Sequence, residues 1–446
     1  MKKTIKLLIY IIAAVIFAAI PLAACSEGNS GDYAVPVYED DAVITIGAWV
    51  PYIGDGTQAR YDEIAAAGFT VLFNIHDQLN WTNPEASNYV LNYLNGADAA
   101  GMKAVLYDEA MYGVDAGLND QYAHLYMGHP ALIGSNLKDE PSKINFTNLA
   151  VKQSLYKERY PDKLGFINLF PDVGGTTLGA PDFTDYLISY METVQPELLS
   201  YDNYVLLEDG SVKDSFFSDM AKVRYIAKEY GVPAHNFFLA VGHKAGPFRY
   251  RQPNEAEFRW QMACDLAYGY SGFTYYCYWE GRDINYEECI ISKKGKKTDL
   301  YYYAQAVNLE MLAWDHVYLN FDWQGTALVK GSQSFANVLF MSVSEEDKVT
   351  AAGGVKSVVS TRDALFGMFT DGNNNKGFMV TNATNPFDNL DNTVTVEFES
   401  KYKGVMIYGK DVCQSGEPEI LPLKKGKVTI ELEPGEGKFL IPLVNK

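Results

Sequence analysis

Residues 43–75 read VITIGAWVPYIGDGTQARYDEIAAAGFTVLFNI, and this stretch contains the unit from which the fold is predicted. Two short runs rich in β-branched and aromatic residues, 43–50 and 69–75, lie on either side of a helical pattern over 57–67. A strand, a helix and a strand in this order predict two parallel strands of one sheet. Gly68 directly follows the helical run, where a left-handed backbone favours glycine, as do Gly101 and Gly231 after later runs.

The same alternation continues along the chain to about residue 318. The predicted strands are 43–50, 69–75, 102–107, 131–138, 164–169, 197–201, 236–241 and 272–278. The predicted helices are 57–67, 87–100, 118–127, 145–159, 184–192, 214–230, 254–268 and 299–314. Repeated β/α units over about 275 residues match the size of a (β/α)8 barrel, so we predict a TIM barrel over 43–320.

The pattern changes after residue 320. Short alternating runs are separated by turns rich in Asn, Gly and Lys, and the predicted strands are 337–343, 377–381, 393–398, 404–408, 427–432 and 438–442. Strands at short regular spacing indicate an antiparallel β-sandwich over 321–446.

The composition is that of an acidic globular protein. Of its 446 residues, 48% are hydrophobic and 21% are charged, which predicts a large core and two or three domains. The net charge is −19, and it becomes −22 if Lys2, Lys3 and Lys6 are removed with a leader. Such a surface repels phosphate backbones, so we expect no nucleic-acid partner. The one dense basic run, 293–297, is short, and we interpret it as a solvated loop.

The first residues have the layout of a secretory signal. A basic start is followed by an apolar run and small residues, and we assign 1–24 as a leader. The sequence LAAC at 22–25 resembles the bacterial lipobox, and this resemblance implies a lipid on Cys25 and a lipoprotein of the cell or outer membrane. An ordinary cleaved signal or an uncleaved anchor are the alternatives. Residues 25–42 are predicted to be a tether, flexible over the Gly-, Ser- and Asn-rich part.

The other cysteines are Cys264, Cys277, Cys289 and Cys413, and none of them has a partner at a metal-binding spacing. We therefore expect no metal and no cofactor. Cys264 and Cys277 lie in apolar contexts, which favours buried thiols over disulfides.

Polar and aromatic residues follow nearly every predicted barrel strand. In a TIM barrel these positions meet at one mouth, where the chemistry takes place. Acids, amides and flat aromatic rings suit a sugar, whose hydroxyls they bind and whose apolar face they cover. The candidates, in chain order, are Trp49, Asn74, His76, Asp108, Glu109, Asp139, Glu140, Asn168, Asp202, Tyr204, His243, Trp279 and Glu280.

Two stretches resemble known enzymes. HPALIG at 129–134, leading to DEPS at 139–142, is similar to strand four of clan A glycoside hydrolases, and this likeness implies that Glu140 is the acid/base. FRWQM at 258–262, with AYG at 267–269, GFTYY at 272–276 and YW at 278–279, resembles the last helix and strand of glycoside hydrolase family 42, a β-galactosidase group. The likeness implies an enzyme that cleaves glycosidic bonds of oligo- or polysaccharides, and together with the leader and the lipobox it predicts an exported, lipid-anchored glycoside hydrolase.

One departure leaves the second catalytic group open. Clan A enzymes carry a nucleophilic glutamate at the end of strand seven, and here that strand reads FLAVGH at 238–243, without a carboxylate. Asp202 or Glu280 could be the partner of Glu140. Alternatively, Asp139 orients an acetamido group of the substrate, as in substrate-assisted hexosaminidases. The third possibility is a barrel that binds glycans without cleaving them.

Several candidates also have a simpler interpretation. Glu140 could cap the next helix, and Trp49 and Trp279 could be core residues of the barrel rim. His76 and His243 fit no metal spacing and no nucleophile elbow, so we expect them to bind sugar hydroxyls.

Overall fold

The computed structural model describes residues 32–39, 42–49, 56–73, 81–279, 285–333, 349–350 and 352–446. Residues 33–446 form one compact unit. Within the described ranges, no helix has both the length and the apolar character needed to cross a membrane. The leader and Cys25 lie outside these ranges, so their predictions stay untested.

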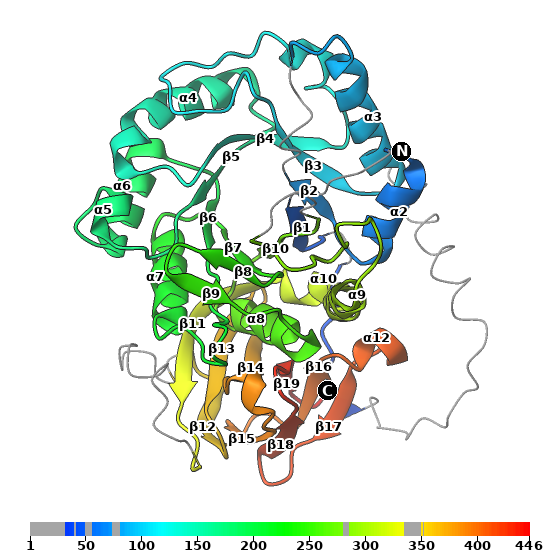
Figure 1. Ribbon diagram of the computed structural model, residues 1–446. Helices are drawn as coiled ribbons and strands as arrows, with labels where there is room; N and C mark the ends of the chain where they lie inside the picture. Colours follow the sequence, from blue (N-terminus) through cyan, green and yellow to red (C-terminus); the bar gives the residue numbers. More distant parts are fainter. Residues whose placement is uncertain are drawn as a thin grey trace. The chain divides into compact units, whose positions relative to one another are not determined.

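The predicted TIM barrel is confirmed. Its parallel strands close into a ring in the order β1-β10-β7-β6-β5-β4-β3-β2, and helices lie outside the ring (Figure 1). The strands are β1 (Thr45–Trp49), β2 (Val71–Phe73), β3 (Lys103–Tyr107), β4 (Leu132–Asp139), β5 (Leu164–Leu169), β6 (Leu199–Asp202), β7 (Ala234–Leu239) and β10 (Gly272–Tyr276). Each overlaps a predicted strand, because a barrel strand covered on both faces is an almost continuous apolar run.

Seven of the eight predicted helices form, and two short helices, Gly175–Leu178 and Asp315–Tyr318, were not predicted. They are α2 (Gln58–Ala66), α3 (Ala86–Ala99), α4 (Phe146–Arg159), α5 (Gly175–Leu178), α6 (Phe183–Val194), α7 (Phe216–Glu229), α8 (Glu255–Ala267), α9 (Asp299–Leu312) and α10 (Asp315–Tyr318). Gly68, Gly101 and Gly231 have φ of 77°, 78° and 69°, as expected for residues that end helices.

The helix predicted over 118–127 is wrong. Only the single 3-10 turn Ala123–Leu125 forms there. Side-chain hydrogen bonds hold this segment instead of a helical backbone pattern. Tyr126 donates its hydroxyl proton to the buried carboxylate of Asp108. Asp120 accepts from Arg159 at 2.6 Å and from Tyr160 at 2.8 Å. These tertiary hydrogen bonds outweigh the weak helical preference of the local sequence.

The prediction also missed a small hairpin beyond the end of β7. It pairs β8 (His243–Ala245) with β9 (Phe248–Tyr250), and Gly246 supplies a turn residue with φ of 55°. The hairpin follows the carboxyl end of its barrel strand, so it belongs to the mouth of the barrel.

The β-sandwich is confirmed as two antiparallel sheets. One has the order β11-β13-β14-β19-β16-β17 and the other the order β12-β15-β18. The strands are β11 (Phe321–Val329), β12 (Val355–Ser360), β13 (Ala364–Asp371), β14 (Lys376–Asn382), β15 (Asn392–Phe398), β16 (Gly404–Tyr408), β17 (Glu419–Pro422), β18 (Lys427–Leu432) and β19 (Gly437–Leu443). The strand predicted over 337–343 lies outside the described residues.

The larger sheet is buried on both faces. Phe366 and Phe378 pack toward the smaller sheet, whereas Phe369 and Phe439 belong to the core that contains the barrel helices. Helix α8 lies against this second face, where Thr381 donates to the carbonyl of Ala263 at 3.1 Å. The barrel and the larger sheet therefore share one hydrophobic core.

Part of the predicted tether contacts the β-sandwich. Tyr33 forms a β-bridge with Asn445, and the backbone N–H of Ala34 donates to Val444 at 3.0 Å. Tyr38 packs against Phe321, with ring centroids 5.4 Å apart. Tyr33, Ala34 and Tyr38 of the predicted tether thus contact the β-sandwich, whereas Val37 is exposed.

Candidate active site

The carboxyl ends of three neighbouring strands bring together the strongest sequence candidates. Asp139 ends β4 and is in register with Asn168 of β5, while Asp202 ends β6. Glu140 directly follows β4. We call Asp139, Glu140 and Asp202 the carboxyl cluster. Its position at the carboxyl ends of the strands is where barrel enzymes carry their reacting groups.

Asn168 connects the members of the carboxyl cluster. Its side-chain amide is buried and donates to Asp202 at 2.6 Å and to Asp139 at 3.3 Å. Its side-chain oxygen accepts from Ser200 at 2.8 Å, which fixes the orientation of the amide. A buried amide with both ends bonded is rigid, so Asn168 sets the spacing between the two aspartates.

The backbone of Glu140 has an uncommon conformation. Its φ is 47°, in the left-handed region that residues with a Cβ rarely adopt. The N–H of Glu140 donates to the carbonyl of Asn168 at 2.8 Å, and the hydroxyl of Tyr186 donates to the carbonyl of Pro141 at 2.6 Å. These bonds hold the chain in a geometry that aims the Glu140 side chain at Asp202. Strain of this kind is found at functional sites more often than elsewhere.

The side chains of Glu140 and Asp202 are hydrogen-bonded to each other. Burial is the main cause that raises the pKa of Asp202 well above its ordinary value, and the charges of Glu140 and Asp139 raise it further. Burial and the charge of Asp139 raise the pKa of Glu140 to about 7, although Asp202 and Lys138 oppose the shift. Two carboxyls in contact, one of them buried, do not both ionise readily, so the pair retains a proton near neutral pH.

Aromatic rings line the site beside Asp202. Tyr204 hydrogen-bonds to Asp202 and stacks on Tyr276, with ring centroids 4.9 Å apart. His243 begins the hairpin and stacks on Tyr286 at 5.0 Å, and its ring is within 5.8 Å of Tyr204. His243 is only 5% exposed, so it supports the wall formed by the half-buried Tyr204.

The candidates after β3 have separate roles. The buried carboxylate of Asp108 accepts from the indole of Trp81 at 2.7 Å, from the N–H of Ala110 at 2.8 Å and from Tyr126. The three hydrogen bonds to Asp108 hold the loop that follows β3 in place. Glu109 is exposed. The sugar contacts predicted for both residues stay predictions.

Trp49 and Trp279 are buried. Trp49 is 5% exposed and packs edge-on against Phe237 inside the barrel, with centroids 5.0 Å apart. Trp279 is 6% exposed and carries the guanidinium of Arg60 above its ring at 5.1 Å. Both positions favour the core interpretation over a sugar-stacking platform.

Three candidates fall outside the description of the structure. Asn74, His76 and Glu280 lie in 74–80 and 280–284, so their predicted roles stay untested. Among the described residues, no group of His, Cys, Asp and Glu side chains is arranged to hold a metal ion.

The sequence analysis missed two residues next to the carboxyl cluster. Lys138 donates to the hydroxyl of Tyr112 at 3.1 Å and to the backbone carbonyl of Asp139 at 2.5 Å. Its positive charge lowers the pKa of Glu140. Lys138 adjoins Asp139 in the sequence and could have been found as the cation nearest to the predicted acids, whereas Tyr112 reaches the site from a loop without regular structure.

Comparisons with known proteins found similar solved structures but no match in sequence. No protein-family model matches the chain, and no curated protein matches it in sequence. A solved β-galactosidase from the psychrophilic Marinomonas ef1 is similar, with 8% identity and a TM-score of 0.46, over 61% of this chain and 60% of that enzyme. A GH30 endoxylanase from Clostridium papyrosolvens C71 has 10% identity and a TM-score of 0.44, over 92% and 98%.

A glucosidase from Croceicoccus marinus is also similar, with 12% identity and a TM-score of 0.43, over 89% of this chain and 95% of that one. This chain spans less than two thirds of the length of the Marinomonas β-galactosidase. Likeness at these identities and scores transfers no activity, so the function has to be argued from the residues of this chain.

Proposed function

We propose that this protein is a glycoside hydrolase in which Glu140 protonates the departing oxygen and Asp202 is the second carboxyl. The observation that carries the proposal is the hydrogen bond between the half-buried carboxyl of Glu140 and the buried carboxyl of Asp202, at the mouth of a closed barrel. Glycoside hydrolysis requires two carboxyl groups on either side of the bond that breaks. The pair supplies both groups from strands that Asn168 locks together.

The protonation state of the pair suits this chemistry. Burial and neighbouring charges raise the pKa of both carboxyls, that of Glu140 to about 7, so the pair retains a proton near neutral pH. It then consists of one acid and one carboxylate. A glycosidase needs an acid for the leaving oxygen and a carboxylate for the sugar carbon.

The spacing favours retention of configuration. An inverting pair is separated by about 6.5–9.5 Å to leave room for water, whereas a retaining pair is separated by about 5–5.5 Å. Carboxyls in hydrogen-bond contact are nearer to the retaining distance and reach it by a small separation when a sugar enters. Glu140 then gives its proton to the glycosidic oxygen as the bond to C1 breaks, and Asp202 bonds to C1. Water, deprotonated by Glu140, releases the sugar.

Asp139 supports a second route to the same products. It shares the amide of Asn168 with Asp202 and directly precedes Glu140. If the substrate carries a 2-acetamido group, the carbonyl oxygen of that group can attack C1 while Asp139 orients it. This route also retains the configuration. Restriction of activity to 2-acetamido sugars would identify it.

The experiment is a screen of reporter glycosides, with β-galactosides first because of the family 42 resemblance. We expect wild type to release product, and Glu140→Gln and Asp202→Asn to lose about 10²–10⁴-fold in kcat/KM. Glu158→Gln is the control, since Glu158 is exposed on helix α4 and belongs to no candidate site, and it should keep full activity.

Two outcomes would overturn the proposal. Undiminished hydrolysis by Glu140→Gln would remove Glu140 from the reaction. Saturable glycan binding by wild type, measured by calorimetry, without cleavage of any glycan in the screen would establish instead the non-catalytic glycan-binding protein.

We further propose that the mature protein is exported and anchored by a lipid on Cys25. The support is the leader followed by LAAC at 22–25. Cells grown with labelled fatty acid should label the wild-type chain, and Cys25→Ser should abolish the label. Equal labelling of both chains, or labelling of neither, would contradict the anchor.

A further inference from the structure

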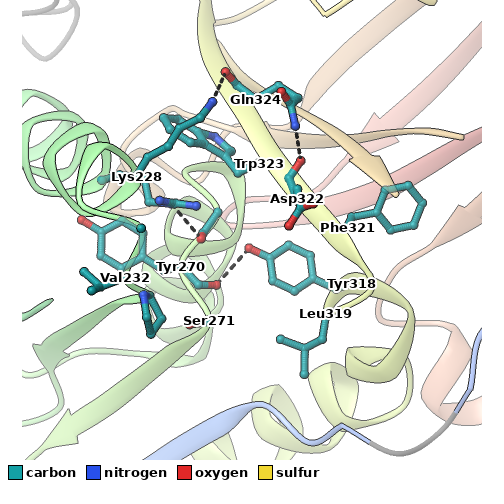
Figure 2. A pocket seen from close by; sticks show the side chains of 14 residues that line it. Lys228, Val232, Tyr270, Ser271, Tyr318, Leu319, Phe321, Asp322, Trp323 and Gln324 are labelled. Atoms are coloured by element: carbon teal, nitrogen blue, oxygen red, sulfur yellow. Dashed lines mark hydrogen bonds between the residues drawn. The ribbon is translucent and has the colours of Figure 1, made fainter. Parts of the chain in front are cut away.

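A cavity of about 410 Å³ lies at the end of the barrel opposite the carboxyl cluster. Its lining includes residues 231–233 and 269–271, which immediately precede β7 and β10, together with the start of β11. Parallel strands begin at one end of a barrel and carry the reacting groups at the other. The cavity is thus separate from the proposed active site. Figure 2 shows Lys228, Tyr318, Asp322 and Trp323 around it.

Two cations line this cavity from one helix. Arg224 and Lys228 are one turn apart on α7, and both lie over the indole of Trp323, at 4.7 Å and 5.2 Å from its centroid. Like charges at this spacing repel each other. Burial lowers the pKa of Arg224, and burial followed by the charge of Arg224 lowers the pKa of Lys228.

The protein partners of these cations are neutral. Arg224 donates through Nε to the carbonyl of Gly269 at 3.0 Å, and Lys228 donates to the carbonyl of Gln324 at 3.2 Å (Figure 2). In the part of the chain that the structure describes, neither cation has a carboxylate within 4.0 Å. Asp322 lines the same cavity and acts on both cations only through its longer-range charge.

Several other cations of this acidic chain are paired with carboxylates. Arg251 pairs with Glu257 at 2.7 Å, and Arg259 pairs with Glu310 at 2.8 Å. Lys222, on the same helix as Arg224, pairs with Asp219 at 3.1 Å and with Asp172 at 3.6 Å. The cavity is therefore a local positive site in a chain of net charge −19.

We propose that this cavity binds an oxyanion, either a free inorganic anion or the carboxylate of a ligand no larger than one acidic sugar. An oxyanion placed between Arg224 and Lys228 relieves their mutual repulsion and accepts charge-assisted hydrogen bonds from both. The volume lies within the range of small-molecule sites, about 300–1,000 Å³. The indole of Trp323 is 3% exposed, so it orients the cations and leaves no face for a sugar ring.

The test is titration calorimetry of the full chain at constant ionic strength, with sodium sulfate, sodium glucuronate and methyl glucoside as probes. We expect one saturable site for at least one of the two anions and none for the neutral sugar. Binding of sulfate alone identifies an inorganic oxyanion, and binding of glucuronate identifies an organic carboxylate. Both results support the proposal.

Variants assign the signal to the cavity. Lys228→Gln should weaken binding about fivefold, whereas Asp322→Asn should strengthen it by a similar factor because a repelling carboxylate is removed. Lys222→Gln, on the same helix, should leave the affinity unchanged. Lys228 and Asp322 are exposed, so these substitutions keep the packing of Arg224 intact. The proposal would be overturned if neither anion bound saturably. It would also be overturned if Lys222→Gln and Lys228→Gln weakened anion binding equally.

Discussion

Replacing Glu140 with Gln should change how the stability of the protein depends on pH. The folded-state pKa of Glu140 is raised from 4.5 to about 7, so the folded chain binds this proton more tightly than the unfolded chain does. An acid of this kind contributes stability that is fully present below about pH 4.5 and is lost as the pH rises to about 7.

The size of the effect follows from the pKa shift. At about 1.4 kcal/mol per pKa unit, the shift corresponds to about 3 kcal/mol of unfolding free energy, which partial exposure reduces to about 2–3 kcal/mol. Gln cannot ionise, and without the nearby charge Asp202 also ionises more easily. Between pH 4.5 and pH 8, the unfolding free energy of the variant should therefore rise by about 2–3 kcal/mol relative to that of wild type.

Urea unfolding at the two pH values measures this difference directly. Glu109→Gln is the control, because its exposed side chain predicts a change of less than about 0.5 kcal/mol. If the Glu140→Gln variant also changes by less than that amount, Glu140 is not buried against Asp202 and the reasoning about the pair is refuted.

Three further predictions test neighbouring residues. Asn168→Ala should lower the free energy of unfolding by about 2–3 kcal/mol, because it removes buried hydrogen bonds to the carboxyl cluster; a loss in urea unfolding below 0.5 kcal/mol would contradict its connecting role. Tyr204→Phe removes a donor that lowers the pKa of Asp202, so the acidic limb of the kcat/KM profile should move to higher pH, and an unmoved profile would exclude that contact. A thiol reagent should modify Cys413 in the folded chain and reach the other described cysteines, which are buried, only after unfolding; rapid modification of two or more of them would show that this burial is wrong.

The barrel could be predicted because its strands and helices are locally simple. Each barrel strand is a short apolar run between helical patterns, and Gly68, Gly101 and Gly231 mark helix ends. Strands β15 and β18 alternate buried and less buried residues, since one face of the smaller sheet is exposed. These patterns depend on neighbours in the sequence and are visible there.

The parts that were missed depend on contacts between distant residues. Strand β13 reads ALFGMFTD without alternation, because both faces of its sheet are covered. The segment 118–127 lacks a helix because Asp108 binds Tyr126 from across the loop. Such contacts leave no local period in the sequence.

The site divides in the same way. Asp139, Glu140, Asn168 and Asp202 were found because the carboxyl ends of barrel strands converge. Direct contact between Glu140 and Asp202 could not be predicted, since it depends on the left-handed backbone at residue 140. Tyr286, which supports the aromatic wall, carries no motif of its own.

The most direct test of the central claim compares leaving groups on the sugar that the screen identifies. Glu140→Gln should lose about 10²–10⁴-fold in kcat/KM on a methyl or sugar leaving group, which needs a proton to depart. On a 2,4-dinitrophenyl glycoside, whose phenolate departs without a proton, the same variant should lose about tenfold or less. Equal losses on both substrates would contradict proton donation by Glu140.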